Sequence, residues 1–266
     1  DIIIRLDAHG RIPEDFVSKN VECMESGEYV TGGPRPNLPE KDTPWQRLLL
    51  SAESSMFGSG IAGFRRENEK KYVKSMFHAA YRREVFEKVG FFNEELVRTE
   101  DNEIHYRMRK AGYKLCFDPD IISYQYTRSS LKAMLKQKYA NGYWIGKTSK
   151  VCPKCLSIYH FVPFAFVSAI IASGSVIGAT GLAECIKKRH NHTLGKGISA
   201  LRKVTVVLTT VMWVLYALMA SGMAAVSAFK AEDKRNITNA CLPVLFLLLH
   251  LSYGIGTIAG LMDKSK

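Results

Sequence analysis

The amino-acid sequence predicts an α/β fold that continues into C-terminal transmembrane helices. Strand-like and helix-like segments alternate in the first half, and three long runs without charged residues occupy the second half. The net charge of +12 and the mean hydropathy of −0.07 average over these unlike halves. Residues 1–155 carry 26 basic and 21 acidic side chains, whereas residues 156–266 carry only 11 and 4. A hydrophobic fraction of 47% excludes a disordered chain, and Gly, Pro and Cys without a period exclude collagen-like and disulfide-rich classes.

The first segment, DIIIRLDAHG, is an apolar run that ends in an acidic turn. This pattern predicts a buried parallel strand that delivers polar groups to the carboxyl edge of a sheet. A buried strand needs neighbours, yet neither Met nor an earlier strand precedes this one. We therefore expect a piece of a longer protein, with a processed N-terminus as the alternative.

The rest of the first half alternates between helical and extended patterns. Apolar residues at helical spacing predict four helices, over residues 11–26, 45–57, 82–90 and 100–112. Gly90 and Gly112 are expected to end the last two. Thr99 is expected to cap the fourth helix at its N-terminus. The alternation over residues 113–127 predicts a strand or a strand pair.

Three uncharged runs, over residues 155–183, 204–229 and 236–262, each exceed the roughly 20 residues that a membrane-spanning helix needs. They predict two or three transmembrane helices, at about residues 158–182, 204–229 and 239–262. Pro163 and three glycines leave room for the first run to be kinked or re-entrant. This divides the chain into an α/β catalytic-type part (1–128), a basic interfacial helix or linker (129–155) and a membrane domain (156–266).

The basic joints at residues 132–154 and 187–203 bear on orientation, because Lys- and Arg-rich joints favour the cytoplasm. Three full spans place these two joints on opposite sides of the membrane, whereas a re-entrant first run places both in the cytoplasm. Both arrangements stay open. Much of the positive charge is assigned to these joints and not to a surface for nucleic acid.

Two short motifs are rejected as cofactor or metal sites. The glycines of GSGIAG, at positions 58, 60 and 63, match a dinucleotide fingerprint by letter, but that fingerprint follows a strand and opens a helix. Here a predicted helix precedes and a charged run follows. Cys152 and Cys155 have metal-binding spacing, but no second pair accompanies them and structural zinc needs four ligands. The other cysteines fit buried positions in a reducing compartment.

Two acidic motifs have catalytic potential. Asp7 and His9 lie on one side of the predicted strand end, where a carboxylate and an imidazole can hold Mn²⁺ or Mg²⁺ against phosphate oxygens. Both residue types are also common in turns. Glu100 and Asp101 occupy the first turn of a predicted helix. They suit capping and the helix dipole, and they also suit a general base that takes a hydroxyl proton.

In combination and order, these segments resemble glycosyltransferase family 2, inverting enzymes of the GT-A (Rossmann-like) fold, and in particular the membrane-anchored succinoglycan-biosynthesis type. The resemblance covers residues 1–155. It rests on the strand ending in DAH, on a second motif formed by Arg82, Arg83, Glu84, Gly90, Phe92 and Glu94, and on a third formed by Glu100, Asp101, Arg107, Gly112 and Tyr113. The strands that carry the nucleotide contacts in this family do not precede residue 1. We therefore expect a partial, N-terminally truncated GT-A domain.

The resemblance implies a function for each candidate residue. Asp101 is expected to be the catalytic base, with Glu100 as the second choice. Asp7 and His9 are expected to hold a divalent cation, Mn²⁺ or Mg²⁺. Contacts to donor or acceptor are expected from four residues: Arg82, Gln137, Lys138 and Trp144. The last three also fit a helix anchored at the membrane interface.

The implied reaction moves a sugar from a nucleotide-diphosphate donor to a lipid-linked saccharide acceptor, in polysaccharide biosynthesis at the cytoplasmic face of the cell (inner) membrane. Processive members of the family carry Q-x-x-R-W, and residues 136–144 lack its Arg-Trp pair. This favours addition of a single sugar. Two alternatives remain: a transferase acting on polyprenyl phosphate, and a membrane protein whose basic cytoplasmic domain binds ligands without catalysis.

Overall fold

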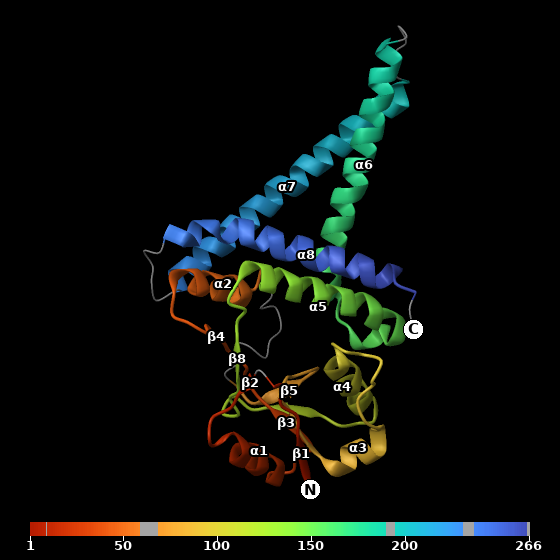
Figure 1. Cartoon of the computed structure of the whole chain (residues 1–266). Helices are drawn as coiled ribbons and strands as arrows, with labels where there is room; N and C mark the ends of the chain where they lie inside the picture. The colour runs from red at the N-terminus through yellow and green to blue at the C-terminus, as the bar shows by residue number, and fades with distance from the viewer. Residues whose placement is uncertain (9, 59–68, 190–194, 231–236, 265–266) are drawn as a thin grey trace.

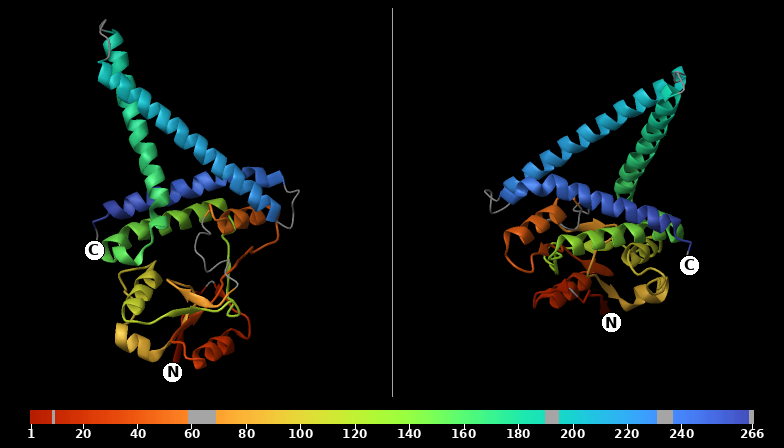
Figure 2. Two further views of the ribbon diagram at one scale, coloured as in Figure 1. Left: turned by 180° about the vertical axis from the view of Figure 1, so that it is seen from behind. Right: turned by 45° about the horizontal axis from the view of Figure 1, so that its top comes forward.

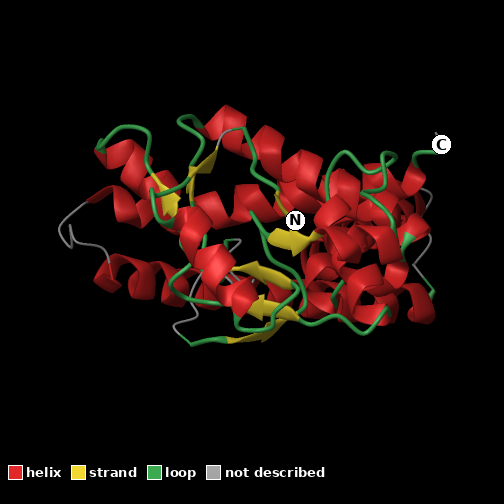
Figure 3. Cartoon of the chain, turned by 90° about the horizontal axis from the view of Figure 1, so that it is seen from below, coloured by secondary structure: helices red, strands yellow, loops and turns green. Residues whose placement is uncertain are grey.

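The structure is a computed structural model that describes residues 1–8, 10–58, 69–189, 195–230 and 237–264. It consists of an α/β part, two helices laid side by side over it, and two long helices that project from that layer (Figure 1). The N-terminus lies at the far end of the α/β part from the projecting helices, and the strands lie between groups of helices (Figure 3). The predicted fold class, α/β followed by helices apolar enough to span a membrane, is confirmed.

The main sheet has five short strands in the order β1-β6-β3-β7-β5. They are β1 (Ile2–Ile4), β3 (Val30–Gly32), β5 (Lys71–Val73), β6 (Ala80–Arg82) and β7 (Leu115–Phe117). Within this sheet, among the described residues, only β3 and β7 pair in parallel, and the other three pairings are antiparallel. Among these residues β1 pairs with β6 alone, antiparallel, and Ile2 is exposed. The expectation of a buried parallel first strand is therefore wrong here: the antiparallel partner comes from much later in the chain.

A second, small sheet has the order β2-β8-β4, formed by Gly10–Arg11, Tyr124–Tyr126 and Asn37–Leu38. The segment predicted as one strand or a pair thus supplies two strands to different sheets, β7 and β8. The polar turn between them, DPDIIS, separates the two strands.

Four helices of the α/β part lie where helical spacing predicts them: α1 (Phe16–Glu25), α2 (Pro44–Ser54), α3 (Arg83–Val89) and α4 (Glu100–Lys110). Gly90 and Gly112 follow α3 and α4 with φ values of 80° and 95°, the left-handed region that glycine enters freely. Side chains of α3 and α4 pack with Val30, Tyr81 and Leu115 in the core against the main sheet. This core fixes the face of α4, and therefore where its N-terminus lies.

The second half is almost entirely helical. Its helices are α5 (Leu131–Val151), α6 (Val162–Arg189), α7 (Lys196–Lys230) and α8 (Leu242–Met262), with short 3₁₀ turns η2 (Pro153–Cys155), η3 (Ile158–Phe161) and η4 (Ile237–Cys241). Three segments are long and apolar enough to cross a membrane: Ile158–Lys187, Lys196–Phe229 and Asn239–Met262. α6 is one continuous helix, so the re-entrant alternative for the first run is not what the structure contains.

The three candidate spans differ in arrangement. α6 and α7 project from the α/β part and meet at a distant tip, whereas α8 lies across their base alongside α5 (Figures 1 and 2). Only 6% of the apolar window of α6 or α7 is buried, compared with 39% for α8. We call the contact between α5 and α8 the α5–α8 seam.

Glycines make the close approach in the seam possible. A Cβ atom built on Gly142 of α5 would lie 1.9 Å from the carbonyl oxygen of Tyr253 on α8. One built on Gly256 of α8 would lie 2.1 Å from the carbonyl oxygen of Tyr139 on α5. Gly146 and Gly260 repeat this pattern one turn further along each helix. Small residues at four-residue spacing thus bring the two backbones into contact.

Candidate functional site

The site is built around the N-terminus of α4, where Glu100 and Asp101 begin the helix. The residue before them, Thr99, has φ +67°, a left-handed conformation that is unusual for a β-branched side chain. Its side chain makes no capping hydrogen bond, so the predicted N-cap is wrong in its chemistry, although the helix begins where expected. The Thr99 hydroxyl instead pairs with the hydroxyl of Thr148 on α5 at 2.5 Å. A neighbouring bond from Arg98 Nη1 to Asn141 Oδ1 at 2.7 Å ties the same turn to α5.

Asp101 is a buried carboxylate, and one of its two oxygens accepts no hydrogen bond from the described residues. Its side chain is 5% exposed, and Oδ1 accepts a hydrogen bond from the backbone N–H of Asn102 at 2.9 Å. Among the residues that the structure describes, Oδ2 has no hydrogen-bond partner. Burial, and then the negative charge of Glu100, raise the pKa of Asp101 to about 6. A carboxyl group tuned toward neutral pH with a free oxygen is equipped to accept a proton.

Glu100 is engaged differently. Its Oε1 accepts a hydrogen bond from Arg5 Nη2 at 2.6 Å, and the same guanidinium nitrogen lies 3.0 Å from Asp7 Oδ1. The Arg5 side chain therefore bridges the carboxylate after β1 to the start of α4. This joins the two acidic motifs of the sequence in one place, as expected for a site that handles a charged substrate.

Asp7 is ionised under almost all conditions. Contact with the buried His78 imidazole, whose Nε2 lies 3.5 Å from Oδ2, is the main cause, followed by Arg5. Together they outweigh burial and hold the pKa of Asp7 at about 2. His9, its predicted partner for a metal, lies outside the described residues. Within them no three His, Cys, Asp or Glu side chains converge as a metal site.

The side of α4 facing the core is a rigid support. His105, fully buried, pairs through Nε2 with the Tyr81 hydroxyl at 2.9 Å and through Nδ1 with the Ser75 hydroxyl at 3.1 Å. Burial, and then Arg5 and Arg109, lower the pKa of His105 to about 3, so the ring is neutral. The neutral ring can therefore donate a hydrogen bond to one of the two hydroxyl groups and accept a hydrogen bond from the other.

The other predicted contact residues lie elsewhere. Arg82 donates from Nε to the Glu28 carbonyl at 3.0 Å and from Nη2 to the Met24 carbonyl at 2.6 Å, which holds the end of α1. Lys138 forms a buried ion pair with Glu53 of α2 at 3.1 Å. No described contact brings either residue to Asp101. Their functional assignment stays a prediction, beside the structural role that the contacts show.

Gln137 and Trp144 lie on α5. Gln137 Oε1 is buried without a hydrogen-bond partner among the described residues, and the Trp144 ring packs edge-on against Tyr143 at 5.7 Å. The structure therefore places them on the helix that covers the site, consistent with either the ligand contact or the interfacial anchor that the sequence suggests.

Several site residues were not found from the sequence. Arg5 carried a usable signal, since the strand period of two places it on the same side as Asp7. His78, with φ +48°, and Thr148, deep in a basic helix, carry no local signal because long-range packing alone brings them to the site. Arginines at positions 35, 98 and 128 add positive charge: Arg35 acts on both Asp7 and Asp101, and burial followed by Arg128 lowers the pKa of Arg98.

Comparison with known proteins identifies the family of the chain. Residues 2–257 match the family described as glycosyl transferase family group 2. The chain belongs to that family. The match extends over the α/β part, α5 and most of the apolar helices, so the membrane half is part of the family's pattern and not an unrelated attachment.

Three curated relatives are similar over part of their length. The succinoglycan biosynthesis protein ExoA of Rhizobium meliloti (strain 1021) is 28% identical over 53% of this chain and 43% of its own. The O-antigen chain rhamnosyltransferase RfbN of Salmonella typhimurium is 29% identical over 48% and 42%. A Methanococcus voltae protein, the dolichyl N-acetyl-alpha-D-glucosaminyl phosphate 3-beta-D-2,3-diacetamido-2,3-dideoxy-beta-D-glucuronosyltransferase, is 23% identical over 65% and 54%. The chain thus spans about half the length of these relatives.

Proposed function

We propose that the full-length protein transfers a sugar, with inversion at the anomeric carbon, from a nucleotide-diphosphate donor to a lipid-linked saccharide. The observation that carries this proposal is Asp101: a buried carboxylate of raised pKa with an available oxygen, at a site attached to apolar helices. Family membership supports glycosyl transfer as the reaction class.

In the proposed step an acceptor hydroxyl attacks the anomeric carbon as Asp101 Oδ2 takes its proton. The bond from that carbon to the diphosphate oxygen breaks, and the nucleoside diphosphate leaves on the opposite face. At pH 7 a carboxyl of pKa about 6 is mostly ionised, and it is a stronger base than an ordinary aspartate. Arg5 holds Glu100 Oε1 in an ion pair, and the raised pKa of Asp101 is the reason to assign the base to Asp101.

A divalent cation fits Asp7 in charge and chemistry. Its carboxylate is ionised and 20% exposed, and Mg²⁺ or Mn²⁺ is commonly held by one or two protein ligands plus substrate phosphates. Asp7 with His9 would hold the ion. When bound, it supplies charge neutralisation for the leaving diphosphate. Arg5, Arg98 and Arg128 would add to that positive charge from the protein itself.

The acceptor class is supported by the apolar helices and by the relatives. One relative is named for a dolichyl-linked glucosaminyl phosphate, and others for succinoglycan and O-antigen synthesis. The basic helix α5, with Gln137 and Trp144, covers the site and would meet the headgroup of a lipid-linked saccharide at the cytoplasmic face of the cell membrane. Direct transfer to a polyprenyl phosphate is the second candidate, and analysis of the product by mass spectrometry separates the two.

The decisive test uses full-length protein in its membranes. Asp101→Asn should lower the rate of sugar transfer by about 10²- to 10⁴-fold at unchanged protein abundance. Glu100→Gln is the matched control and should retain more turnover. Wild-type turnover in Asp101→Asn would contradict the assignment of the base.

Chelation tests the metal independently of the base. EDTA should stop transfer, and Mn²⁺ or Mg²⁺ should restore it. Transfer that is indifferent to EDTA removes Asp7 and His9 from this role but leaves the assignment of Asp101 intact.

A further inference from the structure

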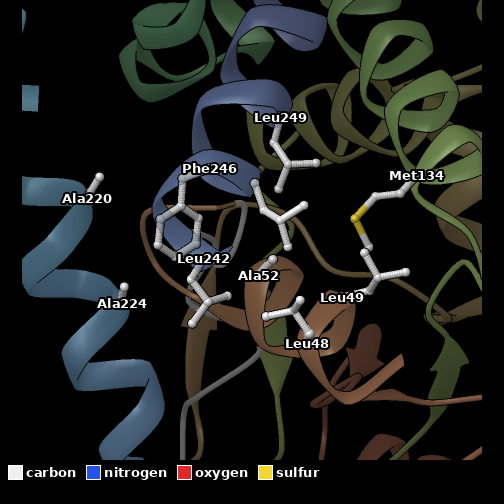
Figure 4. Packing of buried hydrophobic residues seen from close by; sticks show 10 residues of the cluster. Leu48, Leu49, Ala52, Met134, Ala220, Ala224, Leu242, Phe246 and Leu249 are labelled. Carbon is white, nitrogen blue, oxygen red and sulfur yellow. The ribbon is translucent and has the colours of Figure 1, made fainter. Parts of the chain in front are cut away.

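α8 is long and apolar enough to cross a membrane, yet both of its ends contact the α/β side of the molecule. At its N-terminal end, Leu242 and Phe246 pack with Leu48, Leu49 and Ala52 of α2 (Figure 4). At the opposite end, Asp263 contacts α5: its backbone carbonyl accepts from Lys150 Nζ at 2.7 Å, and its carboxylate accepts from the Tyr143 hydroxyl. Between these ends the glycines of the α5–α8 seam keep the helices in contact.

α5 is bonded to the α/β part at several points along its length. It begins just after β8, and Asn141 and Thr148 bond the start of α4. Lys138 pairs with Glu53 of α2, and further lysines lie at positions 132, 136, 147 and 150. α8 runs parallel to α5, since Ser252 bonds the Leu135 carbonyl at 2.7 Å and Asp263 lies at the far end beside Lys150.

This arrangement conflicts with a transmembrane α8. A spanning helix has its ends on opposite sides of a hydrocarbon core about 30 Å thick. A straight helix of 21 residues is about as long as that core is thick. If it crossed the core, its two ends would therefore lie on opposite sides and could not both contact protein on one side. The N-terminal end of α8 packs on α2 and its C-terminal end is bonded to α5, which itself lies against the α/β part, so both ends are on one side and α8 lies along the membrane plane.

α6 and α7 behave in the opposite way. Their near ends lie at the α5–α8 layer and their far ends at the tip, well away from the α/β part (Figures 1 and 2). The tip is charged, with an ion pair between Arg202 of α7 and Glu184 of α6 and with Lys187 and Lys188 close by in sequence. Apolar helices with charged residues at the distant end are typical of a membrane hairpin.

We propose that the described chain crosses the bilayer twice, through α6 and α7, and that α8 lies in the membrane interface on the catalytic side. Its outer face, which includes Val244, Ile255 and Met262 at 60%, 49% and 73% exposure, is then a surface that docks on lipid. The occupant is the bilayer because α6 and α7 enter it from the same layer. This inference concerns topology and stands apart from the proposed reaction.

The charge distribution agrees with two crossings. They place α5 and the C-terminal ends of α7 and α8 on one side, and the tip where α6 and α7 meet on the other. The first group of segments carries more Lys and Arg than the tip, which favours the cytoplasm for the catalytic side.

Cysteine labelling from each side of the membrane tests the proposal. Native Cys241 precedes α8 and native Cys185 lies near the tip, and both are exposed. Single-site reporters are prepared in the full-length protein after replacing the other accessible cysteines with Ser: Cys185 alone, Cys241 alone, Lys264→Cys alone and Lys132→Cys alone. Each is treated with a membrane-impermeant maleimide in right-side-out and in inverted sealed vesicles. Lys132→Cys on α5 marks the catalytic side.

We expect Cys241, Lys264→Cys and Lys132→Cys to be labelled from one side and Cys185 from the other. Labelling of Cys241 and Lys264→Cys from opposite sides overturns the proposal, because α8 then spans. Labelling of Cys185 from the same side as Lys132→Cys overturns it too, because the hairpin then does not cross. A protease-cleavable tag after Lys266 provides a second measurement that needs no cysteine replacement. It should be cut only in vesicles that expose the catalytic side, and protection there overturns the proposal.

Discussion

The α5–α8 seam and the α6–α7 hairpin each join two long helices, and α8 is as apolar as α6 and α7, yet the two regions differ in how they use glycine. In the seam, a Cβ atom on any of four glycines would lie 1.9 to 2.6 Å from a backbone carbonyl oxygen of the facing helix. In the hairpin, Gly174, Gly178 and Gly222 have nothing within 4 Å of such an atom. Apolar composition therefore does not distinguish a helix that lies against protein from one that faces lipid. The surroundings of its small residues do.

The two regions also differ in their charges. Lys138 of the seam and its partner Glu53 of α2 are 5% and 7% exposed, whereas Glu184 and Arg202 of the hairpin are 33% and 39% exposed. Lys138 of the seam belongs to a buried ion pair, and α5 bonds the start of α4; in the part of the hairpin that the structure describes, we find neither feature. We infer that the seam supports the site and that the hairpin mainly anchors it.

The largest expected difference concerns the ion pairs. Glu53→Gln should destabilise the protein by about 3–5 kcal/mol, because it leaves the buried Lys138 ammonium without its carboxylate. Glu184→Gln should cost about 0–1 kcal/mol, because the pair is partly exposed. The unfolding midpoint of each variant in detergent measures both. Equal losses would contradict the contrast between the regions.

Glycine substitutions should give the next largest effect. Gly256→Ala places a methyl group against the Tyr139 carbonyl, and overpacking of this kind costs about 1–3 kcal/mol. Gly174→Ala meets nothing and should leave the midpoint unchanged or slightly raised. The same unfolding assay applies. A Gly256→Ala protein as stable as wild type would show that the helices are less closely packed than described.

Threonine substitutions test the link from the seam to the base. Thr148→Val removes the hydrogen bond to Thr99, and loss of about 1 kcal/mol of positioning should lower kcat about fivefold. Thr148→Ser should restore it. Thr180→Val is the control, since that hydroxyl bonds only its own helix carbonyls in the described structure, and its kcat should not change. Equal losses of kcat in Thr148→Val and Thr180→Val would indicate a general effect of replacing threonine and would contradict the link to Asp101.

The smallest effect is a shift in pH dependence. Transfer needs Asp101 ionised, so the rate should fall about tenfold per pH unit below its pKa of about 6 and level off above it. If Thr148→Val loosens the packing of α5 near Asp101 and admits water, the pKa of Asp101 falls and the acidic limb of the pH–rate profile moves to lower pH. The limb of Thr180→Val should coincide with that of wild type. A limb unmoved in Thr148→Val would show that burial of Asp101 does not depend on this contact.

Much of the architecture followed from local patterns. Helical periodicity located α1 to α4, and the absence of charge located the three apolar segments. Asp7 and the Glu100–Asp101 pair were interpreted as catalytic because the order of the motifs resembles glycosyltransferase family 2, since each motif alone also fits a turn or a helix start. Even so, only the fold brings Arg5 to Glu100 and His78 to Asp7.

What the sequence left open depends on long-range contacts. The antiparallel partner of β1 comes from residues 80–82, and no local period encodes that pairing. Thr99 looked like a helix cap because Thr often is one, but its hydroxyl is drawn instead to Thr148. Likewise, α8 has the length and hydropathy of a spanning helix, and only its contacts with α2 and α5 reveal the different orientation.

The parallel course of α5 and α8 has a consequence for the order of assembly. During synthesis, the base on α4 and the helix that steadies it leave the ribosome well before α8 does. α5 acquires its partner only after the α6–α7 hairpin has been made. Gly142 and Gly146 remain uncovered until then. The contacts between α5 and α8 therefore form after the rest of the candidate site has been synthesised.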